Sequence, residues 1–87
     1  MTTNLAARPV TTIQLTDLSS LRRMLIAAAI DKTYCKLLLE APERAVKDGF
    51  GGEDFPMTEF ALEAVSNIRA KNLVDFIRLI NEKIPIL

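Results

Sequence analysis

The sequence predicts an all-α protein, a compact bundle of four or five short helices with an extended N-terminal tail. Apolar residues recur at spacings of three and four from residue 18 onward, as on the buried face of a helix. Residues that start or stop helices interrupt this pattern at several points. Hydrophobic residues make up 49% of the 87 residues but aromatic ones only 6%, so aliphatic side chains must fill one small core.

Residues 1–15 form the predicted tail, because they include Pro9 and several β-branched residues and show little helical periodicity. Ile13 and Leu15 alternate with polar residues, which would let this segment lie along an apolar groove of a partner. The alternative is a terminus without fixed structure. The helical domain is expected to span residues 16–87.

Two helices are expected between the tail and residue 40. Thr16 or Asp17 is a suitable N-cap for the first of them. Asp31 can end the first helix and cap the second, which is expected over Lys32–Glu40, and one continuous helix through Asp31 is the open alternative. The apolar stripe of the first helix consists of Leu18, Leu21, Leu25, Ala28 and Ala29.

A short third helix and a glycine-rich corner follow. Pro42 suits the first position of a helix, and Gly49 is a natural terminator because it adopts left-handed backbone conformations. We expect Phe50 and Phe55 to turn inward and hold the corner against the core, while the acids at 53–54 face water. A helix before the glycines and two acids after them favour a turn over a phosphate-binding loop.

The last third of the chain predicts a fourth helix capped by Thr58 and a final helix that Asn72 recaps and Pro85 ends. The final helix has the clearest apolar stripe, formed by Leu73, Phe76, Ile77, Ile80 and Ile84.

Further aliphatic residues lie outside the stripe of the final helix, and a domain of this size has little room to bury them. We therefore expect Leu79, Ile86 and Leu87 to contact another chain, together with Ile13 and Leu15 of the tail. Val74 is expected to lie under the first helix. The alternative is that these are scattered exposed aliphatic side chains, which soluble proteins commonly have.

The residue types exclude most catalytic chemistries. The chain has no histidine, the commonest general base, the usual partner of a nucleophilic serine or cysteine, and the commonest metal ligand. Cys35 is the single cysteine, so the chain holds neither a zinc-finger ligand set nor a redox dithiol. The sequence therefore predicts a protein that is not an enzyme and that needs no metal or cofactor.

Charge gives no reason to expect binding to nucleic acid or to an anionic membrane, because 11 basic residues balance 11 acidic ones. Arg22 and Arg23 are expected to face solvent. A single cysteine and the absence of a signal-peptide pattern predict a cytoplasmic protein. The longest apolar run, residues 24–30, is too short to cross a bilayer.

Across roughly residues 20–80, the chain resembles the leader-peptide domain related to nitrile hydratase α subunits, a clan that includes leaders of ribosomally made, modified peptides. The matching positions are Leu38, Leu39, Ala41-Pro42-Glu43, Ala45, Gly49-Phe50, Phe55, Met57-Thr58, Ile68 and Phe76. The resemblance implies a non-catalytic helical region that a modifying enzyme or an exporter recognises, followed by a core peptide that is cut off.

This sequence departs from that pattern after the last helix, where only Pro85-Ile86-Leu87 follow, so no core peptide is expected. Gly51-Gly52 precedes the last two helices, where a cleavage site is not expected, and the metal-binding cysteine cluster of nitrile hydratase is missing. We therefore predict a leader-like binding module that docks on a larger protein. The alternatives are a small structural subunit of a larger complex, with self-association possible, and a small DNA-binding regulator.

Overall fold

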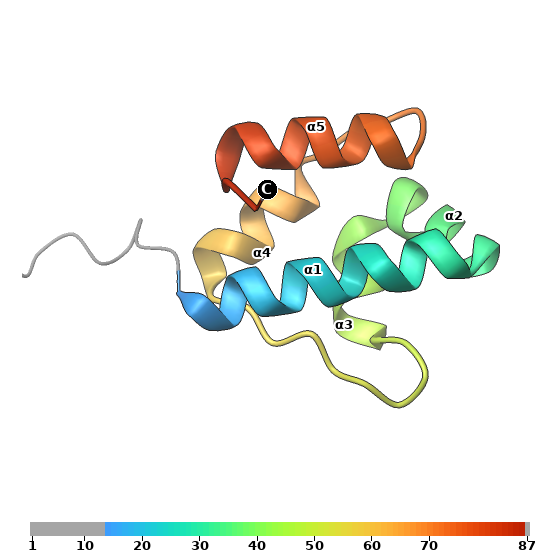
Figure 1. Cartoon of the computed structure of the whole chain (residues 1–87), viewed down its shortest axis with the longest axis horizontal. Helices are drawn as coiled ribbons and strands as arrows, with labels where there is room; N and C mark the ends of the chain where they lie inside the picture. Colours follow the sequence, from blue (N-terminus) through green and yellow to red (C-terminus); the bar gives the residue numbers. More distant parts are fainter. Residues whose placement is uncertain (1–13, 87) are drawn as a thin grey trace, which may run out of the picture.

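The computed structural model describes residues 14–86, which fold into helices and confirm the predicted all-α class (Figure 1). Ile13 and Leu87, both predicted to bind a partner, lie outside the described residues. None of the helices within 14–86 has the length and apolar character needed to cross a membrane. The five helices are α1 (Leu15–Ile30), α2 (Lys32–Glu40), α3 (Pro42–Asp48), α4 (Glu59–Ser66) and α5 (Leu73–Lys83).

The helices lie at two levels, and residues 49–58, which we call the return segment, join them. Figure 1 shows α5 running antiparallel to α1, with α4 between them near the start of α1 and with α2 and α3 following its C-terminal end. After α3, residues 49–58 run back along α1 to reach α4. Direct contacts of α1 with this segment and with α5 therefore determine which face of α1 is buried.

The N-cap of α1 lies two residues before Thr16, so the assignment of Thr16 or Asp17 as the cap was wrong. Gln14 is the N-cap, and its backbone N–H donates to Asp17 Oδ2 at 3.0 Å. The same carboxylate accepts the Thr58 backbone N–H at 2.8 Å and the Thr58 hydroxyl at 2.9 Å. Asp17, which is 0% exposed, thus ties the starts of α1 and α4 together.

The predicted starts of the other helices hold, whereas α5 ends at Lys83, so that Ile84 of the predicted stripe is its C-cap. Asp31 separates α1 from α2 and accepts the Tyr34 N–H at 2.8 Å, so the open alternative of one continuous helix is wrong. Pro42 starts α3, and Gly49 ends it with a φ of 70°. Thr58 accepts the Ala61 N–H at 3.3 Å. Asn72 accepts the Asp75 N–H at 2.8 Å, which caps α5 as predicted.

The glycine corner is a tight hairpin turn. Phe50 and Glu53 exchange two backbone hydrogen bonds, of 3.0 and 2.9 Å, around Gly51 and Gly52. Both of these glycines have positive φ, of 60° and 79°, which a two-residue turn of this kind requires. Gly49 also has positive φ, and in addition a Cβ at this position would collide with the Glu53 carbonyl oxygen.

Only one of the two corner phenylalanines is a full member of the core. Phe55 is 3% exposed, as predicted, whereas Phe50 is only partly buried. Both rings contact Tyr34, with ring centroids 5.3 Å away for Phe50 and 6.2 Å away for Phe55. The predicted inward position is therefore confirmed for Phe55 and holds only in part for Phe50, whose ring sits at the rim of the core.

The core contains side chains from all five helices and from the segments that join them. Helix α5 contributes Phe76 and Ile80 of its predicted stripe, and Ile84 follows as its C-cap; all three are 0% exposed. Helix α4 ends at Ser66, and Ile68 is buried from the following loop. The apolar side chains that α1 and α4 bury fully are Leu21, Met24, Ala61 and Val65.

Candidate functional site: the outer face of α1

Helix α1 is apolar on two opposite sides. Successive residues of a helix are turned by ~100° about its axis, and the buried positions of α1 centre on Met24. Ile26 therefore lies on the opposite side of the helix. Ile26 is 60% exposed and Ile30 is 74% exposed. Leu15, the first residue of α1, is 84% exposed and points in nearly the same direction as Ile26. We call the following exposed residues the outer face of α1: Leu15, Ser19, Arg22, Ile26, Ala29 and Ile30.

One edge of the outer face opens into an apolar groove between α1 and α5. The groove has a volume of about 390 Å³, and Arg22 is the only charged residue among the described residues that line it. Ala29 contributes a small side chain, which leaves room for another helix to approach closely. The other lining residues are Leu25, Ile26, Ile77 and Ile86.

Polar contacts of the residues after α5 hold the lining residue Ile86 in place. The Ile86 N–H donates to Asn81 Oδ1 at 2.8 Å, and Arg22 Nε donates to the Ile86 carbonyl oxygen at 3.2 Å. These bonds fold the residues after α5 back onto α1, where Ile86 is only 2% exposed. The groove is therefore preformed, and it does not depend on a partner for its shape.

A smaller hollow of about 170 Å³ lies on the other edge of the outer face, beside the glycine corner. Ile26 and Ile30 line it together with Phe50, and Arg23 and Glu53 form its polar rim. Ile26 therefore stands as a ridge between two hollows, one on each side of α1. A ridge flanked by grooves is the surface shape into which another helix packs.

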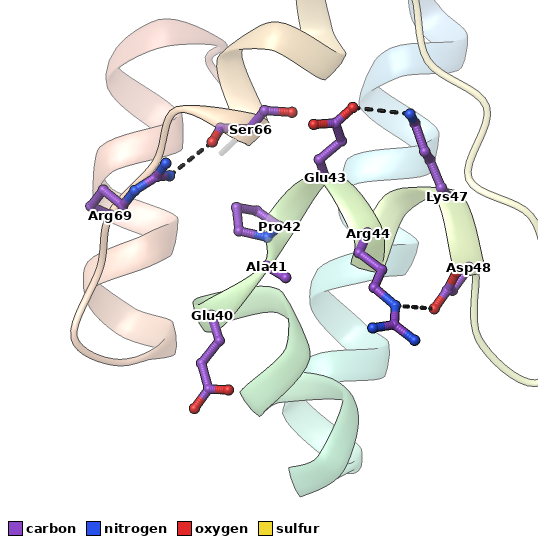
Figure 2. Close-up of a pocket in the computed structure, with 9 residues that line it drawn as sticks. All are labelled: Glu40, Ala41, Pro42, Glu43, Arg44, Lys47, Asp48, Ser66 and Arg69. Atoms are coloured by element: carbon purple, nitrogen blue, oxygen red, sulfur yellow. Dashed lines mark hydrogen bonds and ion pairs between the residues drawn. The ribbon is translucent and has the colours of Figure 1, made fainter.

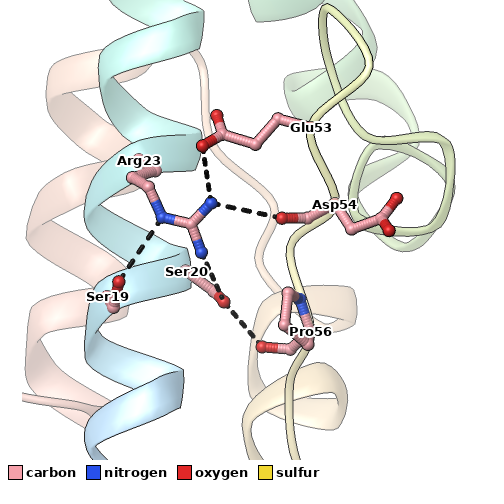
Figure 3. Close-up of polar contacts among 6 residues, drawn as sticks. All are labelled: Ser19, Ser20, Arg23, Glu53, Asp54 and Pro56. Carbon is pink, nitrogen blue, oxygen red and sulfur yellow. Dashed lines mark hydrogen bonds and ion pairs between the residues drawn. The ribbon is translucent and has the colours of Figure 1, made fainter.

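Arg23 does not face solvent freely, contrary to the expectation for both arginines (Figure 3). Its Nη1 donates to Glu53 Oε2 at 2.8 Å and to the Asp54 carbonyl oxygen at 3.3 Å. Its guanidinium carbon lies 5.6 Å from the centre of the Phe55 ring. Beside it, the Ser20 hydroxyl donates to the Pro56 carbonyl oxygen at 2.6 Å. Arg23 and Ser20 thus attach the return segment to α1 and form no free basic edge.

Another hollow, of about 500 Å³, lies away from the outer face and is lined by charged residues of α3 and by the end of α4 (Figure 2). Its charges neutralise each other: Lys47 pairs with Glu43 at 3.0 Å and Arg44 pairs with Asp48 at 3.2 Å. Arg69 Nη1 donates to the Ser66 carbonyl oxygen at 2.8 Å. No group of histidine, cysteine and acidic residues within 14–86 is arranged to hold a metal ion.

Tyr34 has the most strongly shifted pKa with a clear structural cause. Burial, with the Asp48 carboxylate as a smaller cause, raises the pKa of its phenol to about 12. The hydroxyl donates to the Ala45 carbonyl oxygen at 2.9 Å. At neutral pH the phenol therefore stays protonated and serves as a hydrogen-bond donor that fastens α2 to α3.

Some of the residues predicted to contact a partner are exposed in the structure, and others are buried. Leu15 is exposed, on the outer face. Leu79 is half-buried and packs against the core, and Ile86 is buried, so the expectation that nothing would cover Ile86 was wrong. The expectation that α1 covers Val74 was also wrong, because Val74 is 77% exposed.

The sequence analysis was wrong to place Ala29 in the apolar stripe that α1 buries, since Ala29 is exposed. It also did not single out the exposed Ile26 and Ile30. Their spacing of four, in the direction opposite to Leu21 and Met24, was the available signal. The folding of Ile86 onto Arg22 had no such local signal, since these residues are 64 positions apart.

Comparison of the chain with protein-family models, with curated proteins and with solved structures found no match.

Proposed function

We propose that this protein is a non-catalytic binding module that docks on a larger protein through the outer face of α1. The observation that carries the proposal is the double-sided apolar character of α1, which leaves Ile26 and Ile30 in water although the same helix already fills the core. Exposed apolar side chains gathered on one face are typical of surfaces that contact other proteins.

The shape of this face favours a partner helix. The exposed apolar positions follow the spacing of a helical stripe, and Ala29 beside Ile26 lowers the surface enough for close packing. Helix-in-groove recognition uses anchors of this kind. The resemblance to the leader-peptide domain supports the same role, since such a domain is a handle for another protein.

The test replaces the two exposed isoleucines, Ile26→Asp together with Ile30→Asp, and compares the variant with Thr33→Asp. Thr33 is exposed on α2 and does not belong to the outer face, so it controls for an added charge. Affinity capture from an extract of the source organism should retain a partner with the native chain and with the control variant. The double variant should lose it while its melting temperature stays close to native.

Retention of the partner by the double variant would contradict the proposed surface. A partner that stays bound at fixed stoichiometry through every purification step would favour the alternative of a small structural subunit. A modifying enzyme that binds the chain only transiently and is released after it has acted would favour the leader-like role.

A further inference from the structure

Arg22 distinguishes the kinds of partner that the outer face can accept. It lies between Leu15 and Ile26 in the direction of the stripe, and it is the only charged residue of the outer face. Its Nε is used by the Ile86 carbonyl oxygen, at 3.2 Å. Within residues 14–86, no carboxylate forms an ion pair with it, in contrast to its neighbour Arg23, which pairs with Glu53.

A helix that covers Ile26 would also take water away from the guanidinium of Arg22. The carbonyl contact satisfies one donor, and no described carboxylate between residues 14 and 86 pairs with the charge. Burying an unpaired charge is costly, whereas a guanidinium that meets a carboxylate gains strong, directional hydrogen bonds. A well-matched partner must therefore supply an acidic residue at this point.

A second copy of this chain does not meet that requirement. The outer face contains no acidic residue, and none of the described residues that line the groove beside it is acidic. Two acids of α1 and the corner are already engaged, with Asp17 buried under Thr58 and Glu53 held by Arg23. Pairing two copies through their outer faces would bury two arginines and no carboxylate.

We infer that the outer face of α1 receives an aliphatic helix of a different protein, and that this helix carries a Glu or Asp within its apolar stripe to pair with Arg22. This inference rests on the proposed function, because it specifies the partner of the same surface. It replaces self-association, which the sequence left open, by a heterologous contact that is set by charge.

The probes are two fluorescein-labelled helical peptides of about 18 residues, long enough to cover the ~22 Å of the outer face. Both carry leucines at spacings of three and four on an otherwise identical alanine-rich helix. One has Glu at the centre of the leucine stripe and the other has Gln. Fluorescence anisotropy measures the affinity of each for the whole protein at roughly physiological salt, where charges far from the contact are screened.

The native protein should bind the Glu peptide about tenfold more tightly than the Gln peptide. Arg22→Gln should abolish this difference, whereas Arg44→Gln, which removes an exposed arginine of α3, should preserve it. Ile26→Asp should weaken the binding of both peptides. Thermal melts of the variants confirm that each remains folded.

Equal affinity of the native protein for the two peptides would overturn the inference about the acidic residue and leave the docking surface standing. Failure to bind either peptide would overturn the proposed function as well. Sedimentation of the protein alone should show a monomer. A dimer that Ile26→Asp dissociates would overturn the assignment to a different protein.

Discussion

Helices α1 and α5 are the two longest in the described chain, and they use their apolar residues in opposite ways. Helix α5 gathers its largest side chains on one face, where Phe76 and Ile80 are 0% exposed. Helix α1 buries Leu21 and Met24 equally well but also exposes Ile26 and Ile30 on the opposite side. The difference teaches that a clean apolar stripe indicates a helix that completes its own core, whereas apolar residues all round indicate a helix with a second surface to cover.

The strongest test of this contrast removes one large side chain from each surface. Phe76→Ala should lower the free energy of unfolding by about 3–5 kcal/mol, because it empties a fully enclosed position. Ile26→Ala should change it by less than ~0.5 kcal/mol, because the side chain is already in water. Urea denaturation followed by circular dichroism measures both. A large loss for Ile26→Ala would show that the outer face belongs to the core.

The inner face of α1 can be tested at its polar end. Asp17→Ala should cost about 2–4 kcal/mol, because it leaves the Gln14 N–H and the Thr58 N–H and hydroxyl without their shared acceptor. Asp31→Ala is the matched control, since it removes an ordinary cap contact and should cost about 1 kcal/mol. Equal losses for the two variants would mean that Asp17 acts as a helix cap only, without joining α1 to α4.

The flanks of α5 provide a test of intermediate size. Leu79 is half-buried against the core, so Leu79→Asp should destabilise the fold by about 1–3 kcal/mol. Val74 on the other flank is 77% exposed, and Val74→Asp should have an effect within ~0.5 kcal/mol. Thermal melts distinguish the two variants. If Leu79→Asp abolished binding to a partner without lowering the melting temperature, the original prediction of Leu79 as a contact residue would stand.

The two adjacent arginines should each give a small loss of stability. Arg23→Ala should cost about 1 kcal/mol, since it removes the ion pair with Glu53 and the contact with the Phe55 ring. Arg22→Ala should cost about half of that, because it loses a single contact to the Ile86 carbonyl oxygen. Urea denaturation at low and at high salt should show that high salt reduces the stability loss of Arg23→Ala and leaves that of Arg22→Ala unchanged. A salt-independent loss for Arg23→Ala would point to packing on Phe55 as its main contribution.

Much of the fold follows from local chemistry and could be predicted. Asp31, Thr58 and Asn72 cap helices because each short side chain reaches a backbone N–H three positions on. Pro42 and Gly49 delimit α3 because their backbone preferences are intrinsic. These rules act within one turn of the chain, so reading the sequence in order is sufficient to apply them.

The candidate site was predictable only in part, because it depends on which of several apolar surfaces is covered. Leu15 was correctly placed outside the core, whereas Ile86 was expected outside it and is buried. Nothing local to Ile86 shows that Arg22 and Asn81 fold it back. Likewise, nothing local to Asp17 shows that Thr58 will approach it from 41 positions away.

The sequence by itself determined the helices of this protein, their order and most of their ends, because caps, prolines, glycines and apolar periodicity act over a few residues. Only the tertiary structure decided that α1 turns Met24 inward and leaves Ile26 in water. That choice depends on the return segment and α5 both packing on α1, through contacts of Ser20, Arg23 and Arg22 with distant backbone oxygens. Such contacts join residues far apart in the chain, so the surface that remains free appears only when all the helices are in place.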